Sequence, residues 1–368
     1  MSQSNVIRLA YTTAIFVALA VIGRVFLGRS VPQGPRGPST GRTIPAVISA
    51  RPPANPENAA LRVTLGLYIA DLHDVDLKEA TFSADFYIWL RYAKAKDEAA
   101  AKEIEKLEFV NGKVDSLEEQ DRKTVGGQSY VCWKAHGIFR YYPALQNYPF
   151  DKQYLSIQIE HASMDSSELV FEDDRRSYDR YTDARSRWGV KDSLFVPEYT
   201  LTKVERSTND AVYNTDFGDP DRKETDSVYS HYEVGVSLSR LFAPFFFKIV
   251  LPLFVTLAMA YLVFWIPPKE IQSATGLAMS ALLSCIACNV TVSQNLPSIG
   301  YLVTSDKFFI CTYCLLFLNL SQSVVTYNFY ENGQNDRALA WDRRAQIAFP
   351  ILYVVSFSYL VFEALVLG

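Results

Sequence analysis

Residues 145–161 read LQNYPFDKQYLSIQIEH, and this stretch indicates both a turn and the strand that follows it. The YPFD sequence at 148–151 places a proline and a carboxylate beside two aromatic rings, and proline fixes the backbone angle φ of a turn. Leu155, Ile157 and Ile159 then alternate with polar residues. Successive side chains of a strand point to opposite faces. The stretch therefore predicts a rigid aromatic turn that introduces a strand with one buried face.

The same alternation recurs through residues 58–240. LRVTLGLYIADL at 61–72 and HYEVGVSLSR at 231–240 are two of several such runs. Short strands separated by turn signals are typical of an antiparallel sandwich. The sequence KAKDEAAAKEIEK at 94–106 differs and predicts a short surface helix. We expect residues 58–240 to form an immunoglobulin-like β-sandwich.

Apolar segments with very few charges follow the strand-rich block. Each approaches the ~20 residues that a helix needs to cross a bilayer. Pro244 and Pro252 lie within the first of them, and a membrane bundle tolerates such prolines because neighbouring groups can bond the freed carbonyls. Residues 241–368 are thus expected to form an all-α, four-helix transmembrane domain. The expected spans cover about residues 241–266, 271–293, 306–328 and 345–366.

Two further segments precede the sandwich. Residues 1–30 contain a short apolar run between Arg8 and Arg24, which predicts a signal peptide or a signal anchor. Residues 31–57 are rich in proline and glycine and predict an extended linker without a core.

The composition excludes several classes of protein. The chain of 368 residues has 36 Lys and Arg against 40 Asp and Glu, and its acidic residues are concentrated in the strand-rich block. It therefore offers no basic surface for nucleic acid. Among 5 cysteines only Cys132 lies in the strand-rich block, so we expect no disulfide within the sandwich. The C-x-x-C pairs at 285–288 and 311–314 lie in apolar helical segments and are interpreted as packing residues.

Recognisable catalytic sequences are absent. The chain has no H-E-x-x-H, no phosphate-binding glycine loop and no G-x-S-x-G. The four histidines have no metal-ligand spacing, although the fold could bring His161 and His231 together. We therefore predict no catalytic residues, no metal, no cofactor and no enzymatic activity.

The second apolar segment carries a stripe of residues at helical spacings of three and four. Such a stripe, repeated around an axis, would line a pore in which Ser280 faces the ions. Leu283 and Val290 would then form apolar rings, and an apolar constriction can close a pore by dewetting. Helix packing through small residues explains the stripe equally well. The stripe consists of Gln272, Gly276, Ser280, Leu283, Ala287, Val290 and Gln294.

A strand-rich block, the YPFD turn and four spans in this order resemble the pentameric ligand-gated ion channels, or Cys-loop receptors, over roughly residues 60–368. The turn, with Gln153 after it, matches the F-P-F-D-x-Q turn of that family. Two cysteines flank this turn in many members, and Tyr141 and Leu155 occupy their positions here. The chain therefore resembles the bacterial members, which lack that disulfide.

Other short matches lie at the expected places. Arg240 corresponds to the arginine before the first span, and Leu251-Pro252 to the proline of that span. Asn295-Leu296-Pro297 matches the end of the pore helix, and residues 344–350 resemble the start of the bacterial fourth span.

The resemblance implies a cyclic homopentamer with its pore along the stripe. It implies that the sandwich at residues 58–240 is an extracellular or periplasmic ligand-binding domain. It also implies that the turn transmits agonist binding to the membrane domain through the 297–301 linker. Asp151 would then pair with Arg240 by a charge-assisted hydrogen bond. The residues of this expected coupling region are Tyr148, Pro149, Phe150, Asp151, Arg240 and Pro297.

The agonist is expected to bind between neighbouring sandwiches, among aromatic side chains that suit a cationic amine. Protons, a divalent ion and a small amine all remain open as agonists. The candidate residues are Trp89, Trp133, His161, Tyr213, Tyr229 and Tyr232.

The sequence and the resemblance also give expectations for ion selectivity and for localisation. The anion-channel signature is absent and the sandwich is acidic, which favours a cation-selective pore. We expect a bacterial inner membrane, a periplasmic sandwich, and contacts with lipids and permeant ions. The alternative is a membrane-anchored ligand sensor of the same fold that does not conduct. Gly276 and the lack of inner-mouth glutamates at Gln272 and Ser273 leave that alternative open.

Overall fold

The computed structural model describes residues 60–178, 189–218 and 226–363 of the chain. The predicted signal segment and the predicted linker, at 1–30 and 31–57, lie outside the described residues.

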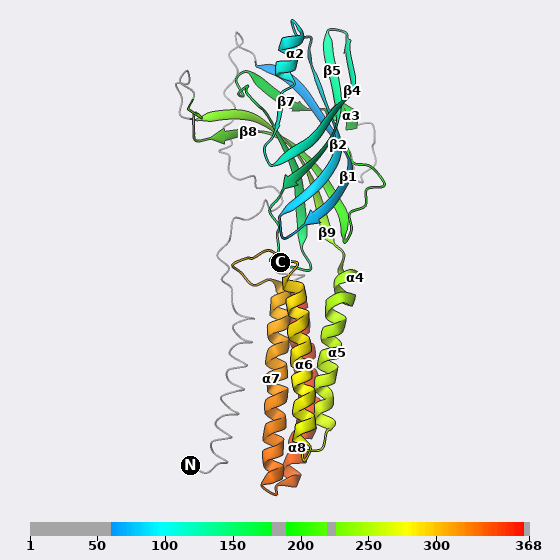
Figure 1. Ribbon diagram of the computed structural model, residues 1–368, viewed down its shortest axis with the longest axis vertical. Coiled ribbons are helices and arrows are strands. Elements are labelled where there is room, and N and C mark those ends of the chain that lie inside the picture. The colour runs from blue at the N-terminus through cyan, green and yellow to red at the C-terminus, as the bar shows by residue number, and fades with distance from the viewer. Residues whose placement is uncertain (1–59, 179–188, 219–225, 364–368) are drawn as a thin grey trace. The chain divides into compact units, whose positions relative to one another are not determined.

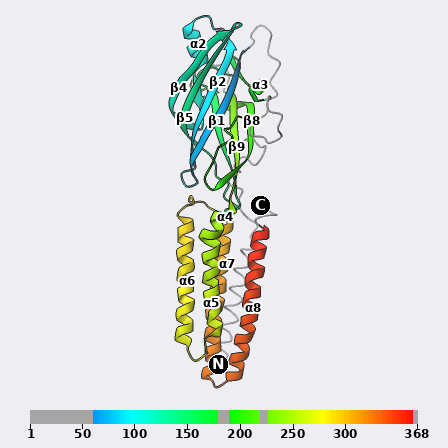
Figure 2. The ribbon, with the colours of Figure 1, turned by 90° about the vertical axis from the view of Figure 1, so that its right-hand side faces the viewer.

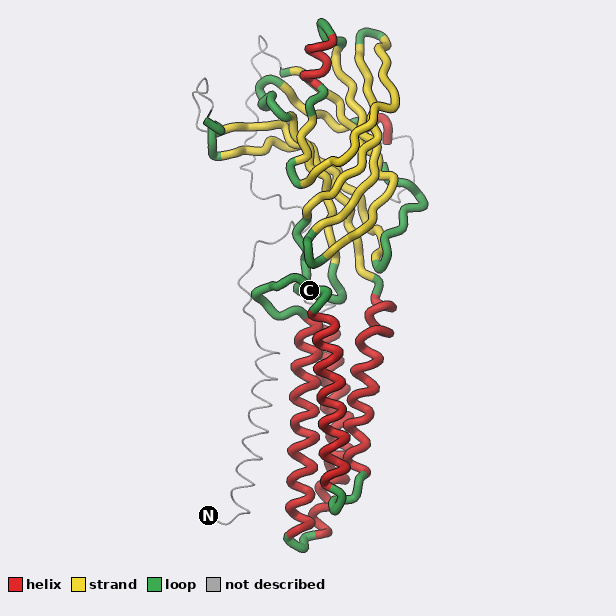
Figure 3. The backbone as a smooth tube through the Cα atoms, viewed as in Figure 1, coloured by secondary structure: helices red, strands yellow, loops and turns green. Residues whose placement is uncertain are grey.

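Two compact units make up the chain, and Figure 3 shows that one is built of strands and the other of helices. Among the described residues, the sandwich unit comprises residues 60–143 and the described part of 152–240. The helical unit comprises residues 144–151 and 241–363. The YPFD turn therefore belongs to the helical unit, although strands of the sandwich precede and follow it in the chain.

The sandwich unit has a five-stranded sheet of order β4-β5-β2-β1-β7 and a four-stranded sheet of order β3-β6-β9-β8 (Figure 1). All neighbouring strands pair antiparallel except β1 and β7, which are parallel. The strands are β1 Leu61–Asp76, β2 Thr81–Ala93, β3 Leu107–Phe109, β4 Gly112–Val125, β5 Gln128–Arg140, β6 Lys152–His161, β7 Leu169–Asp173, β8 Tyr199–Tyr213 and β9 Ser227–Arg240. Two short helices accompany them, α2 Glu98–Ile104 and α3 Arg175–Tyr178.

The core of this unit lies between the two sheets. Leu155, Ile157 and Ile159 of β6 are at most 1% exposed, which confirms the buried face predicted for that strand. From the five-stranded sheet, Phe82 packs on Phe139 with ring centroids 5.6 Å apart. Burial of such side chains from both sheets supplies the main stabilising free energy of a sandwich.

In the described part of the chain, the helical unit contains four helices that are long and apolar enough to cross a membrane, and Figure 2 shows them side by side. Together the two units confirm the predicted fold class, a β-sandwich followed by a four-helix membrane domain. The first span, Phe242–Trp265, consists of α4 Phe242–Phe245, a π-helical segment Phe246–Val250, α5 Leu251–Leu262 and a 3₁₀ turn Val263–Trp265. The other spans are α6 Ile271–Ser293, α7 Thr304–Glu331 and α8 Asn335–Phe362.

Proline explains the irregular start of the first span. Pro252 has no N–H to bond the carbonyl of Lys248, and its ring crowds that carbonyl. The helix widens just before it, and the backbone N–H of Leu251 donates to the carbonyl of Phe246, five residues back. Single π turns of this kind absorb a local misfit without ending a helix.

A second proline is compensated from outside its own helix. Pro350 lies inside α8 and leaves the carbonyl of Gln346 without its helical donor. The hydroxyl of Tyr261, in the first span, donates to that carbonyl at 3.2 Å. A carbonyl freed in an apolar bundle must find another donor, and Tyr261 is that donor.

This compensation predicts a specific coupling in stability. Tyr261→Phe should destabilise the protein by about 1 kcal/mol, because the freed carbonyl loses its partner. In a Pro350→Ala background the new N–H can bond Gln346, so the same substitution should cost markedly less. Thermal unfolding of the four proteins in detergent measures the cycle. Equal costs of Tyr261→Phe in both backgrounds would show that the tyrosine acts through packing alone.

Candidate functional site

The turn between β5 and β6 is closed by its own backbone. The N–H of Tyr148 donates to the carbonyl of Leu145 at 2.9 Å, and the N–H of Phe150 donates to the carbonyl of Asn147 at 2.6 Å. The peptide bond before Pro149 is cis. The two aromatic side chains of this closed turn lie against other parts of the helical unit.

Each aromatic ring of the turn packs on the start of the first span. Tyr148 meets Phe245 edge to face, with ring centroids 5.9 Å apart. Phe150 stacks on Phe242 at 5.3 Å with the rings only 14° from parallel. Aromatic pairs of this kind contribute about 0.5–1.5 kcal/mol beyond the area that they bury.

The turn also bonds the beginning of α7. The backbone N–H groups of Thr304 and Ser305 donate to the carbonyls of Gln146 and Tyr148, at 3.2 and 3.1 Å. The first N–H groups of a helix have no partner within it, so the turn caps α7. The turn thus contacts both the first and the third span.

An apolar cavity of about 240 Å³ lies next to these contacts. Its walls come from the turn, the first span, α7 and α8. They include Phe150, Phe242, Phe245, Ser305, Phe309 and Phe357.

Other members of the predicted coupling region have contacts of their own. Arg240, the last residue of β9, donates to the hydroxyl of Tyr199 and to Glu198 at 3.4 Å. Its guanidinium also lies 4.5 Å from the centroid of the Tyr199 ring. The pairing of Arg240 with Asp151, and the role of Pro297, stay predictions. The turn contacts the start of α7 at Thr304 and Ser305. Within the 297–301 segment named from the sequence, the Tyr301 hydroxyl is hydrogen-bonded to the backbone of Leu145.

The predicted stripe lies on one face of α6. All its members are exposed in the single chain, with Leu283 at 62% and Val290 at 51%. The buried residues of α6 lie on the opposite face. They are Ala274, Ala278, Ala281, Cys285 and Val292. The small residues that pack within this chain are therefore not those of the stripe.

Hydroxyl groups on the exposed side of α6 are internally bonded. Ser280 Oγ donates to the carbonyl of Gly276 at 2.9 Å, and Thr291 Oγ1 donates to that of Ala287 at 3.0 Å. Each hydroxyl keeps lone pairs that can still accept from water or contact a cation. An exposed helix face that carries hydroxyl groups such as Ser280, and the amide of Gln272, suits an aqueous path better than lipid.

An aromatic cluster forms where β8 and β9 approach their connection. The rings of Tyr213, Phe217 and Tyr229 have centroids 5.6–6.4 Å apart. The hydroxyl of Tyr213 donates to Glu160, 3.1 Å from each carboxylate oxygen, and His231 Nδ1 lies 2.7 Å from Glu160 Oε1. Burial and the nearby Glu160 carboxylate raise the pKa of Tyr213, so it stays a neutral donor. We call these five residues the hairpin cluster.

The other predicted ligand residues lie apart from this cluster. Trp133 and Tyr232 are in the sandwich core, and the hydroxyl of Tyr232 donates to Asp173 at 2.9 Å. Trp89 is half-buried and donates its indole N–H to Asp174 at 2.8 Å. The cluster joins Tyr213 and Tyr229 with Phe217 of the same loop, and adds Glu160 and His231, which the sequence analysis did not name as ligand residues. Glu160 occupies a polar position in the alternation of β6, so the sequence pattern indicated an ordinary surface residue.

His161 is buried and fully hydrogen-bonded. Its Nε2 donates to the carbonyl of Glu103 at 2.9 Å, and its Nδ1 accepts the N–H groups of Ser163 and Met164 at 3.2 and 2.8 Å. This pattern requires the neutral ring, since a protonated Nδ1 cannot accept. Burial lowers the pKa of His161, and the bond to the Glu103 carbonyl opposes that shift.

Comparisons with known proteins agree with this geometry. Residues 249–354 match the family model described as the neurotransmitter-gated ion-channel transmembrane region. The chain is 24% identical over 334 residues to the proton-gated ion channel of Gloeobacter violaceus, and the aligned stretch covers 86% of each chain.

Two animal proteins are similar over shorter stretches. The chain is 22% identical over 200 residues to a gamma-aminobutyric acid receptor subunit beta of Caenorhabditis elegans, covering 54% of this chain and 33% of that one. It is 25% identical over 169 residues to pH-sensitive chloride channel 2 of Anopheles gambiae, covering 46% and 26%.

The bonding of His161 predicts how stability depends on pH. The unfolded chain takes up a proton near pH 6.5, whereas the folded ring does so only at lower pH. The stability that neutral His161 contributes is therefore complete above about pH 6.5 and is lost as the pH falls below that value. His161→Gln does not titrate, so the unfolding temperature of this variant should fall less on acidification than that of the wild type. An equally steep fall in both proteins would assign the acid sensitivity to other groups.

Proposed function

Because the chain belongs to the superfamily of pentameric ligand-gated ion channels, we propose that this integral membrane protein is a homopentameric channel whose pore is lined by the stripe of α6. The exposure of the stripe carries the proposal. A face that is neither packed within the chain nor uniformly apolar needs water or other subunits beside it. Five copies around an axis supply both.

The composition of the stripe suggests where the pore closes. Leu283 and Val290 form two apolar rings, and an apolar ring of small diameter excludes water. Gln272, Gly276 and Ser280 give the rest of the pore a small, polar lining. We propose that widening of the Leu283 ring opens the channel. The acidic sandwich raises the local concentration of cations and favours cation selectivity.

The agonist site is proposed at the hairpin cluster. It combines aromatic rings, which suit a cationic amine, with a buried carboxylate and an imidazole. A relative named a proton-gated channel and another named pH-sensitive make acidification the first agonist to test.

Coupling is proposed to run through the turn. The rings of Tyr148 and Phe150 contact the first span, and the carbonyls of Gln146 and Tyr148 cap α7. A displacement of the turn therefore acts on two spans at once. The proposed location is a bacterial inner membrane with the sandwich in the periplasm.

Current through Leu283→Ala tests conduction without knowledge of the agonist. Removing the large apolar side chain should favour the wet pore and give a standing current under voltage clamp. A salt gradient then gives the reversal potential, which is expected near the cation equilibrium potential.

Ile286→Ala is the matched control, because Ile286 is an exposed apolar residue of the same helix that lies to the side of the stripe. This variant should leave the pore closed at rest and give no standing current. The absence of current from well-expressed Leu283→Ala protein would favour the non-conducting sensor, and a standing current in both variants would place the gate elsewhere.

The stack of Phe150 on Phe242 gives a test of coupling. Phe150→Ala should shift the acid-evoked response by about two- to tenfold in proton concentration, because the lost aromatic pair contributes about 0.5–1.5 kcal/mol. The standing current of Leu283→Ala should persist when Phe150→Ala is added, since the pore itself is intact.

Phe242→Ala alone should shift the response similarly, and the double variant should shift it little further. Full additivity of the two substitutions would show that the stack is not part of gating.

A further inference from the structure

Three polar side chains from three neighbouring strands meet on the outer face of the five-stranded sheet. They are His73 of β1, Asp85 of β2 and His136 of β5. Asp85 stands directly opposite His136 in the β2–β5 register. His73 stands opposite Ser83, one diagonal step from Asp85, which is within reach of long side chains.

A bulge in β1 brings His73 to this face. The register shifts between Ile69 and Asp71, and both Ile69 and Leu72 face the core although they are three residues apart. An extra residue in a strand reverses the faces of all residues beyond it. Asp71 and His73 therefore lie on the outer face, beside Asp85.

The three side chains are close enough to share one ion. One ligand atom of each lies within 4.8 Å of the other two. His136 Nδ1 is 2.9 Å from Asp85 Oδ1, and the two imidazole rings are stacked with centroids 5.8 Å apart. Ligands around a tetrahedral zinc ion at about 2.0–2.2 Å are about 3.3 Å apart, so small side-chain rotations suffice.

Two features of this group lack an explanation within the protein. Among the residues that the structure describes, His73 Nδ1 is one of the few buried side-chain atoms without a hydrogen-bond partner, and the nearest carboxylate oxygen, of Asp71, is 3.9 Å away. Asp71 also stands directly opposite Asp85 across β1 and β2. Like charges at paired positions destabilise a sheet. A bound cation would resolve both features.

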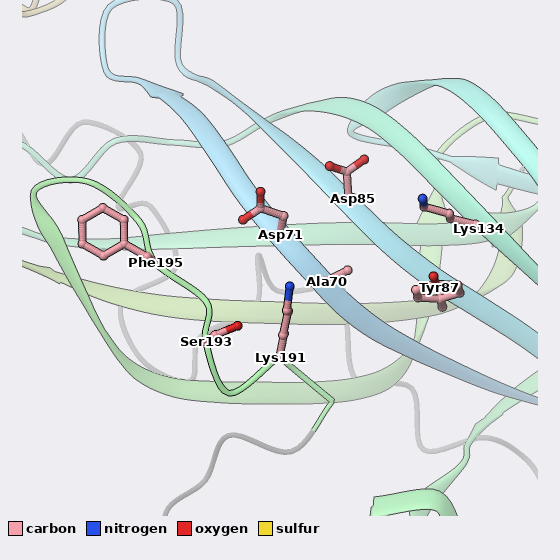
Figure 4. Close-up of a pocket in the computed structure, with 8 residues that line it drawn as sticks. All are labelled: Ala70, Asp71, Asp85, Tyr87, Lys134, Lys191, Ser193 and Phe195. Carbon is pink, nitrogen blue, oxygen red and sulfur yellow. The ribbon is translucent and has the colours of Figure 1, made fainter.

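An open cavity of about 530 Å³ gives access to this face. Figure 4 shows Asp71 and Asp85 on its wall, with Lys134 and Lys191 close by. Two lysines line the cavity beside the two carboxylates, so net negative charge alone does not select the ion. The imidazole nitrogens do, and they favour zinc-like transition metals over calcium or magnesium, which prefer oxygen ligands.

From this geometry we infer that His73, Asp85 and His136 form a binding site for a single transition-metal ion of the zinc class on the outer face of the sandwich. Two imidazole nitrogens and one carboxylate oxygen supply three ligands, and water from the cavity supplies the fourth. The ion would tie together β1, β2 and β5. The site lies within the sandwich unit and does not depend on whether the pore conducts.

Zinc titration of the full-length, tag-free protein tests the site. The protein is purified in detergent, treated with a chelator and titrated with Zn²⁺ in a calorimeter. One Zn²⁺ per chain is expected, with no comparable heat from Mg²⁺ or Ca²⁺. His73→Gln and His136→Gln should each weaken binding by at least about tenfold. Zn²⁺ should also raise the unfolding temperature of the wild type but not of these variants.

His231→Gln is the matched control, because His231 also lies beside a carboxylate, Glu160, but belongs to no group of three metal ligands among the described residues. It should bind Zn²⁺ as the wild type does. Asp85→Asn replaces either histidine variant that fails to fold. Zn²⁺ uptake that is equal in the wild type and in the ligand variants, or that is lost in His231→Gln, would overturn the proposal, as would a wild type that binds none.

Discussion

The cap that the YPFD turn places on α7 is the interaction on which the arrangement of the helical unit depends. A helix that begins at Thr304 leaves its first N–H groups without partners, and near an apolar bundle that omission is costly. Carbonyls of Gln146 and Tyr148 accept two of them. These carbonyls come from a segment that β5 and β6 hold at both ends. The sandwich is thus joined to the membrane domain by the turn as well as by the chain that continues from Arg240.

Two aromatic contacts give that cap its direction. Tyr148 and Phe150 rest on Phe245 and Phe242, which lie where the first span begins and just before its π-helical segment. The π-helical segment lies between Pro244 and Pro252, and π turns of this kind are frequent at functional sites. The turn thus contacts the first span next to its irregular segment.

Much of this could be predicted from the sequence, because the relevant signals are local. The alternation in 152–161 gave the buried side of β6, and spacings of three and four gave the exposed side of α6. Contacts between distant residues have no such signal. The hydrogen bond from Tyr261 to the carbonyl of Gln346 could not be predicted. Trp133 and Tyr232 lie in the core because their side chains are on the inner faces of β5 and β9. The bulge in β1 moves His73 to the same face as Asp85, and the sequence of the strand carries no signal for that bulge.

The histidines of the sandwich have different surroundings, and these decide what the lone pair of each ring can do. His161 holds its loop only as a neutral ring, because Nδ1 accepts two backbone N–H groups. Its lone pair is therefore used within the protein. His73 differs, because among the described residues its buried Nδ1 has no hydrogen-bond partner. A lone pair of this kind, beside His136 and Asp85, can serve a ligand from outside the chain.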